Sequence, residues 1–160
     1  MTVILFYVFA ALAVGAAVVM VAQRNPIYSA FALIVTICAL SVLFGLLGSP
    51  FIAALQVVVY AGAIMVLFLF VLMLLGVKPE DRSSGRTLKA VAVALVAALS
   101  LQMGAVLLGA ARPPATAFDA STRAVAHVLF SPPYLYAFEA TSILILAALV
   151  GSIALARREP

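Results

Sequence analysis

The segment from Phe51 to Val77 constrains this chain more than any other, because it carries no charged residue. At about 1.5 Å of rise per residue, a helix of this length crosses the hydrocarbon core of a bilayer with some tilt. Other long apolar stretches flank it in a chain of 160 residues that is 68% hydrophobic and only 9% charged. This composition excludes a water-soluble globular domain and is typical of polytopic membrane proteins.

The apolar stretches predict an all-α membrane protein with a single polytopic domain of five transmembrane helices. The predicted spans are residues 2–22, 27–47, 51–77, 88–108 and 134–155. Pro26 suits the first turn of the second span, Gly48-Ser49-Pro50 a tight turn, and Ser131-Pro132-Pro133 the start of the last span. In the first span, Ala11 and Gly15 stand four apart and predict a helix-packing face.

The basic residues predict the orientation of the spans. Cytoplasmic loops carry an excess of Lys and Arg, and five spans place the termini on opposite sides of the membrane. We therefore expect the N-terminus outside and the C-terminus in the cytoplasm. One side would hold Arg24, Lys78, Arg82, Arg86, Lys89, Arg157 and Arg158, and the other Arg112 and Arg123. Because the net charge of +4 is spread over loops and forms no patch, we expect no nucleic-acid partner.

The middle of the third span is poorly suited to a regular α-helix. Residues 57–59 are three consecutive β-branched valines, and Gly62 disfavours helix by about 0.8–1.0 kcal/mol relative to Ala. Gln56 and Tyr60, four residues apart, place polar atoms on one face of the span. These features predict a helix that can change its winding. The polar pair would line a water-filled seam or bond to an adjacent helix.

Only one of the five carboxylates, Glu139, lies within a predicted span. An ionisable group there is a candidate functional site, because leaving it unpaired in hydrocarbon costs at least about 2.5 kcal/mol. The alternative is a structural role, in which Glu139 faces the polar interface or is anchored through Ser142. Since no Lys or Arg lies in the interior of a span, a cationic partner would come from another subunit.

The chain lacks the motifs of autonomous enzymes, such as a phosphate-binding loop, a nucleophile elbow or an HExxH pair. Its single cysteine, Cys38, excludes a disulfide framework and is expected to be a small core residue. The segment from Asp119 to Phe130 is expected to form a short amphipathic helix at the membrane interface, with Val125, Val128 and Leu129 on one side. His127 would be solvated there. We predict no catalytic residue, no metal and no cofactor on this chain.

The run LQVVVYAGAIMVLFLFVLML, residues 55–74, resembles the third transmembrane helix of subunit J of respiratory complex I, the NADH:quinone oxidoreductase. Asn25-Pro26 with Ser29, and the segment 129–159, also match that family. The first and fourth spans match only in hydropathy and position. The resemblance covers nearly the whole chain.

The resemblance implies a coupling subunit of a proton-pumping assembly in the bacterial cytoplasmic (inner) membrane. Its neighbours would be the small subunits A and K, the quinone-site subunit, called H, and the antiporter-like subunit, called N. The complex would use NADH, FMN, iron-sulfur clusters and quinone. In the family, the third helix has a π-bulge whose rewinding makes or breaks a hydrated proton path. The residues that match the bulge are Tyr60, Ala61, Gly62, Ala63, Ile64 and Met65, and Gln56 belongs with them to the expected coupling site and proton path.

One departure concerns Gln56, because some family members carry Glu at the matching position. An amide cannot exchange a proton as a carboxylate does, although it can still position water. Two other functions are kept as alternatives. The chain could be a stand-alone small channel or exporter, with Gln56, Tyr60 and Glu139 lining a pore, or a purely structural spacer.

Overall fold

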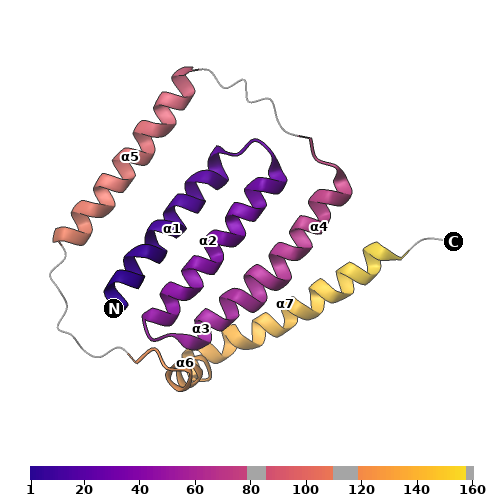
Figure 1. Ribbon diagram of the computed structural model, residues 1–160. Coiled ribbons are helices and arrows are strands. Elements are labelled where there is room, and N and C mark those ends of the chain that lie inside the picture. Colours follow the sequence, from indigo (N-terminus) through magenta and orange to yellow (C-terminus); the bar gives the residue numbers. More distant parts are fainter. Residues whose placement is uncertain (79–85, 110–118, 158–160) are drawn as a thin grey trace.

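The computed structural model describes residues 1–78, 86–109 and 119–157, and every regular element in these ranges is a helix. Three of the elements, α3, η1 and α4, follow one another without a break and form one long rod, the third rod (Figure 1). The elements are α1 (Thr2–Ala22), α2 (Pro26–Leu46), α3 (Pro50–Leu55), η1 (Gln56–Ile64), α4 (Met65–Leu75), α5 (Arg86–Gly109), α6 (Thr122–Leu129) and α7 (Pro132–Ala156).

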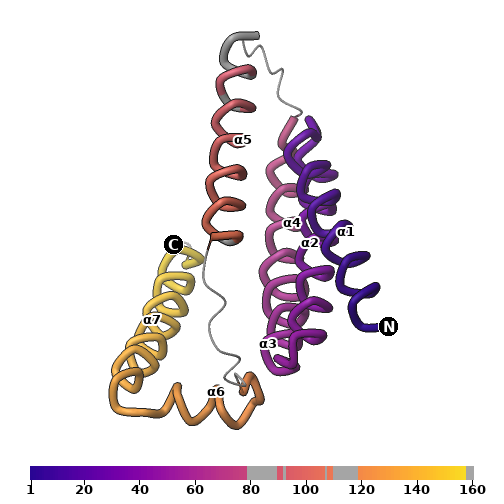
Figure 2. Tube along the Cα trace, turned by 90° about the vertical axis from the view of Figure 1, so that its left-hand side faces the viewer, coloured from indigo at the N-terminus to yellow at the C-terminus, as the bar shows by residue number. Residues whose placement is uncertain are grey.

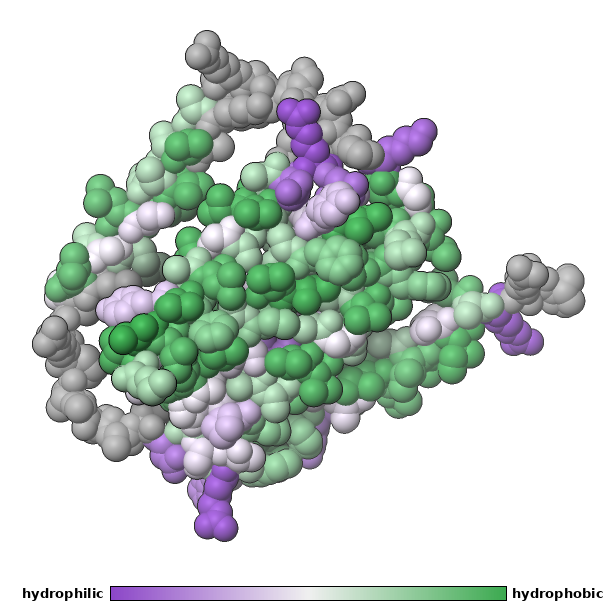
Figure 3. Space-filling view, in the orientation of Figure 1, coloured by the Kyte–Doolittle hydropathy of each residue, from purple (hydrophilic) through white to green (hydrophobic). Residues whose placement is uncertain are grey.

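Among the described residues, four helices are long and apolar enough to cross a membrane: α1, α2, the third rod over Pro50–Leu75, and α7. Hydrophobic side chains cover their flanks, and hydrophilic ones gather toward the ends of the molecule (Figure 3). In α5 the described run of side chains Val93–Val106 is apolar. The helix expected over residues 88–108 is therefore present, but its crossing of the membrane stays a prediction, as does the orientation of the termini.

α2 is the central helix of a three-rod bundle, because α1 packs along it and the third rod packs against it as well (Figures 1 and 2). Small residues at the contacts, such as Ala30 on α2 and Ala61 on the third rod, let the helix backbones approach closely. The core of the bundle consists of Ala30, Ile37, Ala61 and Met65, surrounded by Leu33, Ile34, Leu69 and Leu72.

α5 and α7 lie apart from this bundle. α7 contacts α6, and neither α5 nor α7 makes an extensive contact with the other described helices. Figure 2 shows α7 leaning away from the bundle and α5 beside it. Most side chains of α7 are exposed and apolar, and exposed apolar surface of this extent is typical of contact with lipid or with other proteins.

The helix boundaries follow local signals that the sequence predicts. Pro26 occupies the first position of α2, and the Asn25 side chain accepts a hydrogen bond from the N–H of Ile27 at 3.0 Å. Gly48 adopts a left-handed conformation with φ of 82° in the turn before Pro50. Ser131 precedes α7 as expected, but its hydroxyl donates to the carbonyl of Val128 at 2.6 Å and does not cap α7.

Two predictions about packing are wrong. Ala11 and Gly15 are exposed, and α1 buries Ala13 on its packed side. Cys38 is exposed too, although Ile37 and Ala39 beside it are buried. These helices are apolar all around, so their composition does not indicate which side faces a neighbour.

Some sequence predictions fall on residues that the structure does not describe. They concern the hydrophilic loop at 79–85, the break at Arg112-Pro113-Pro114, and three of the basic residues used for orientation: Arg82, Arg112 and Arg158.

Candidate functional site

The third rod changes its winding over Gln56–Ile64, where η1 is a π-helix. At its end, the N–H of Met65 donates to the carbonyl of Tyr60, five residues earlier. The irregular winding expected near Tyr60–Met65 is thus confirmed, and it begins earlier, at Gln56. Segments of π-helix are rare and occur frequently at functional sites.

The local sequence explains why the winding changes there. The β-branched residues 57–59 lose rotamer freedom in an α-helix, which weakens its advantage over other windings. In the π register the backbone of Gly62 approaches the carbonyl of Val57 so closely that a side chain at this position would crowd it. Gly62 is therefore well suited to the π-helix.

The predicted coupling residues divide between two sides of η1. Ala61 and Met65 are buried, 9% and 5% exposed, in the core cluster with Ala30 and Ile37 of α2. Gln56 is half-buried, and the remaining members are exposed on the side away from the core: Tyr60, Gly62, Ala63 and Ile64. One side of η1 therefore holds the rod to α2, and the other is free to meet water, lipid or a partner.

The polar pair Gln56 and Tyr60 lies on η1 itself. The side chain of Tyr60 is 51% exposed. Neither side chain makes a hydrogen bond to another residue in the described part of the chain. Both side chains are therefore available to bond with water or with an adjacent helix.

Glu139 lies in the second turn of α7, away from η1. Its side chain is exposed, and α7 makes no extensive contact with η1. The hydroxyl of Ser142 donates to the backbone carbonyl of Glu139 at 2.6 Å. The prediction that Ser142 anchors the Glu139 carboxylate is therefore wrong. A serine hydroxyl in a helix readily bonds to a backbone carbonyl of the preceding turn, as Ser142 does here.

The predicted amphipathic helix near residues 119–130 is α6. Its cap is Ser121, whose hydroxyl accepts a hydrogen bond from the N–H of Ala124 at 3.3 Å. Asp119 accepts from the N–H of Ser121 at 2.9 Å, and hydrogen bonding from the Ser121 side chain and backbone lowers the pKa of the Asp119 carboxyl. These bonds fix where α6 begins.

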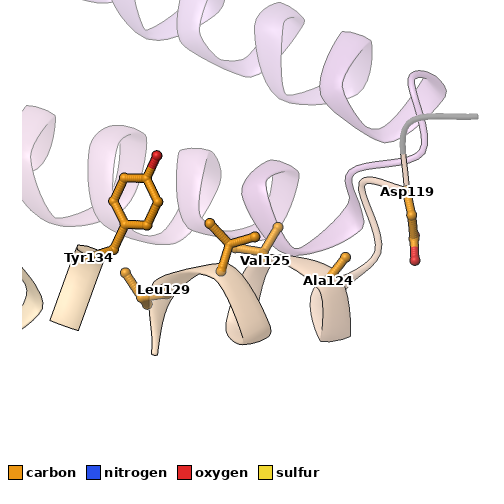
Figure 4. A pocket seen from close by; sticks show the side chains of 6 residues that line it. Asp119, Ala124, Val125, Leu129 and Tyr134 are labelled. Carbon is orange, nitrogen blue, oxygen red and sulfur yellow. The ribbon is translucent and has the colours of Figure 1, made fainter. Parts of the chain in front are cut away.

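The two sides of α6 differ in chemistry. Ala124, Val125 and Leu129 of α6 and Tyr134 of α7 line a largely apolar cavity of about 320 Å³, with Asp119 also in its lining (Figure 4). Arg123 and His127 line a separate hollow with Phe130 and Pro132. A helix of this kind is suited to lie along a membrane surface. The sequence indicated the apolar side but not the cavity, which depends on the corner between α6 and α7.

Ser41 on α2 is a residue that the sequence did not single out. Among the described residues, Ser41 is the one polar residue that is buried. Its hydroxyl donates to the carbonyl of Ala53 in α3 at 2.7 Å. A serine in an apolar helix more often bonds to its own helix, so no pattern could have identified this contact. Among the described residues, no group of three or more His, Cys, Asp or Glu side chains is placed to hold a metal ion.

Comparison with known proteins relates the chain to one family along most of its length. Residues 16–155 match the profile of NADH-ubiquinone/plastoquinone oxidoreductase chain 6. NADH-quinone oxidoreductase subunit J of Pseudomonas aeruginosa is 38% identical over 96% of both chains. NAD(P)H-quinone oxidoreductase chain 6 of Synechocystis is 40% identical over 96% of this chain and 80% of its own length. Subunit J of Escherichia coli is 35% identical over 96% and 86%, respectively.

Proposed function

This chain belongs to the family of NADH-ubiquinone/plastoquinone oxidoreductase chain 6, and we propose that it is a non-catalytic membrane subunit that couples quinone reduction to proton translocation. The π winding of η1 in the middle of a membrane-spanning rod supports this proposal most directly. NADH, FMN, iron-sulfur clusters and quinone would be bound by other subunits of the complex.

The proposed mechanism is a change of winding in η1. A π-helix leaves one backbone carbonyl without its ordinary partner, and water supplies a partner when it has access. If η1 converted to α winding, each one-residue change in its hydrogen-bond register would rotate the following turns by about 100°. Tyr60 and Ile64 would then exchange places with residues now packed on α2. Such a movement would open or close a path for water along the exposed side of η1.

Gln56 and Glu139 have different proposed roles. Gln56, as a neutral amide, would position water beside η1 and would not carry the proton itself. Glu139 would meet a cationic or hydrogen-bonding group of another subunit, because an exposed carboxylate in the bilayer needs a partner or a proton. The exposed apolar sides of α5 and α7 would contact lipid and neighbouring subunits, among them those called A, K, H and N, in the bacterial cytoplasmic membrane.

Two alternatives have less support. A stand-alone channel or exporter would need Gln56, Tyr60 and Glu139 on one pore, and α7 has no extensive contact with η1. Purification in mild detergent separates this alternative from the proposal. Recovery with flavin- and iron-sulfur-containing partners supports a coupling subunit, and a stable homo-oligomer supports a channel. A structural spacer would tolerate changes in η1 that preserve assembly.

A larger side chain at position 62 tests whether the chain is a coupling subunit or a structural spacer. Gly62→Leu or Gly62→Val should shift η1 toward α winding by about tenfold or more, because the added side chain crowds a backbone carbonyl. We expect the complex to assemble and quinone-linked proton pumping to fall. Gly15→Leu is the matched control, since Gly15 has open space around it. Unchanged pumping in an assembled Gly62 variant would contradict the coupling role.

A further inference from the structure

Ser41 connects α2 to the part of the third rod that precedes η1. Its side chain is 6% exposed, and its hydroxyl donates to the carbonyl oxygen of Ala53 at 2.7 Å. Ala53 lies in α3, three residues before Gln56, where the π winding begins. One turn further along α2, Gly45 faces the same residue, because a Cβ added there would lie 3.9 Å from the Cβ of Ala53. The bond is therefore placed next to the change of winding.

At this junction, one backbone N–H is shared between two carbonyl acceptors. The N–H of Gln56 donates to the carbonyls of both Ile52 and Ala53. A three-centre bond shares one proton between two acceptors, so each contact is weaker than a single linear bond. The hydroxyl of Ser41 adds a short hydrogen bond to one of these acceptors, and this bond comes from outside the rod.

At its other end, η1 is held to the same helix by packing. Ala61 and Met65 lie in the core cluster with Ala30 and Ile37 of α2. α2 thus holds the third rod at two places. The hydrogen bond from Ser41 holds it before η1, and the apolar contacts of Ala61 and Met65 hold it at the end of η1.

We propose that Ser41 is a positioning residue that sets where α winding gives way to π winding in the third rod. If packing of Ala61 and Met65 on α2 holds the far end of η1, a one-residue change in the hydrogen-bond register of η1 would rotate α3 by about 100° about the rod axis. The Ala53 carbonyl would then turn away from α2, and its bond to Ser41 would break. The bond consequently favours one register of the rod. Its importance for proton pumping rests on the proposed function, whereas its effect on winding does not.

Ser29 offers a matched control on the same helix. Its hydroxyl donates to the carbonyl of Met20 in α1, also at 2.7 Å. Ser29→Ala therefore removes a bond of the same type and length from α2, but one that does not reach the third rod. A general effect of losing an interhelical hydrogen bond would appear in both variants.

The experiment compares Ser41→Ala and Ser29→Ala in the assembled complex, by structure determination and by protons pumped per NADH oxidised. In Ser41→Ala we expect the population with π winding over residues 56–64 to fall about two- to tenfold, in line with the loss of one hydrogen bond, and pumping to fall with it. Ser29→Ala should change neither. Ser41→Cys, similar in size with only a weak donor, serves if the alanine variant does not assemble.

The two readouts separate the two proposals. Unchanged π winding at residues 56–64 in the Ser41 variants would overturn the positioning role of Ser41. Altered winding with pumping equal to that of Ser29→Ala would uphold the positioning role and overturn the proposed coupling function.

Discussion

A Cβ atom added to Gly62 would lie 3.3 Å from the carbonyl oxygen of Val57, which is closer than Cβ atoms normally come to other groups. Five residues separate the two, which is the spacing of the π register seen between Tyr60 and Met65. The bare backbone of Gly62 and the winding of η1 therefore depend on each other.

The smallest test of this relationship is Gly62→Ala. The methyl group would crowd the Val57 oxygen in the π register, so we expect the balance to move toward α winding, by less than in Gly62→Leu. Proton pumping should fall less than in Gly62→Leu. Gly15→Ala, at a position with open space around it, should pump normally. Equal pumping by Gly62→Ala and Gly15→Ala would argue against the relationship.

The second prediction concerns the contact between α2 and the third rod. Ala30 is 3% exposed in the core cluster, so Ala30→Leu should overpack the contact and destabilise the protein by about 1–3 kcal/mol. The measurement is the midpoint temperature of heat inactivation of the assembled complex. Phe31→Leu, at the neighbouring exposed position, should leave the midpoint nearly unchanged. A midpoint unaffected by Ala30→Leu would show that this contact is loosely packed.

The third prediction tests the placement of α6 and the orientation of the chain. In a Cys38→Ala background, which removes the single native thiol, Arg123→Cys should react with a membrane-impermeant maleimide added outside spheroplasts. Val125→Cys should be protected, because the Val125 side lines the apolar cavity. Labelling of Arg123→Cys only in inverted vesicles would reverse the predicted orientation. Equal labelling of both variants would contradict the placement of α6 along the membrane surface.

Much of the fold follows from local sequence. The apolar stretches indicate where the long helices lie, and Asn25-Pro26, Gly48-Ser49-Pro50 and Ser131-Pro132 mark helix boundaries because caps, prolines and turns act over a few residues. The rotation of each helix cannot be predicted in the same way. The patterns around Cys38 and Gly15 predict packed surfaces, yet both residues are exposed, since an apolar helix in a membrane protein shows no polar side to orient it.

The candidate site also follows in part from local sequence and in part from tertiary structure. The valines at 57–59 and Gly62 are enough to predict an unstable α-helix at the centre of the third span, because backbone preference is a local property. Which residues hold that segment was decided by tertiary structure. Ala61 and Met65 pack on α2 and Ser41 bonds to Ala53 only because two rods come together at a particular rotation. Such contacts join distant parts of the chain, and no pattern within either helix encodes them.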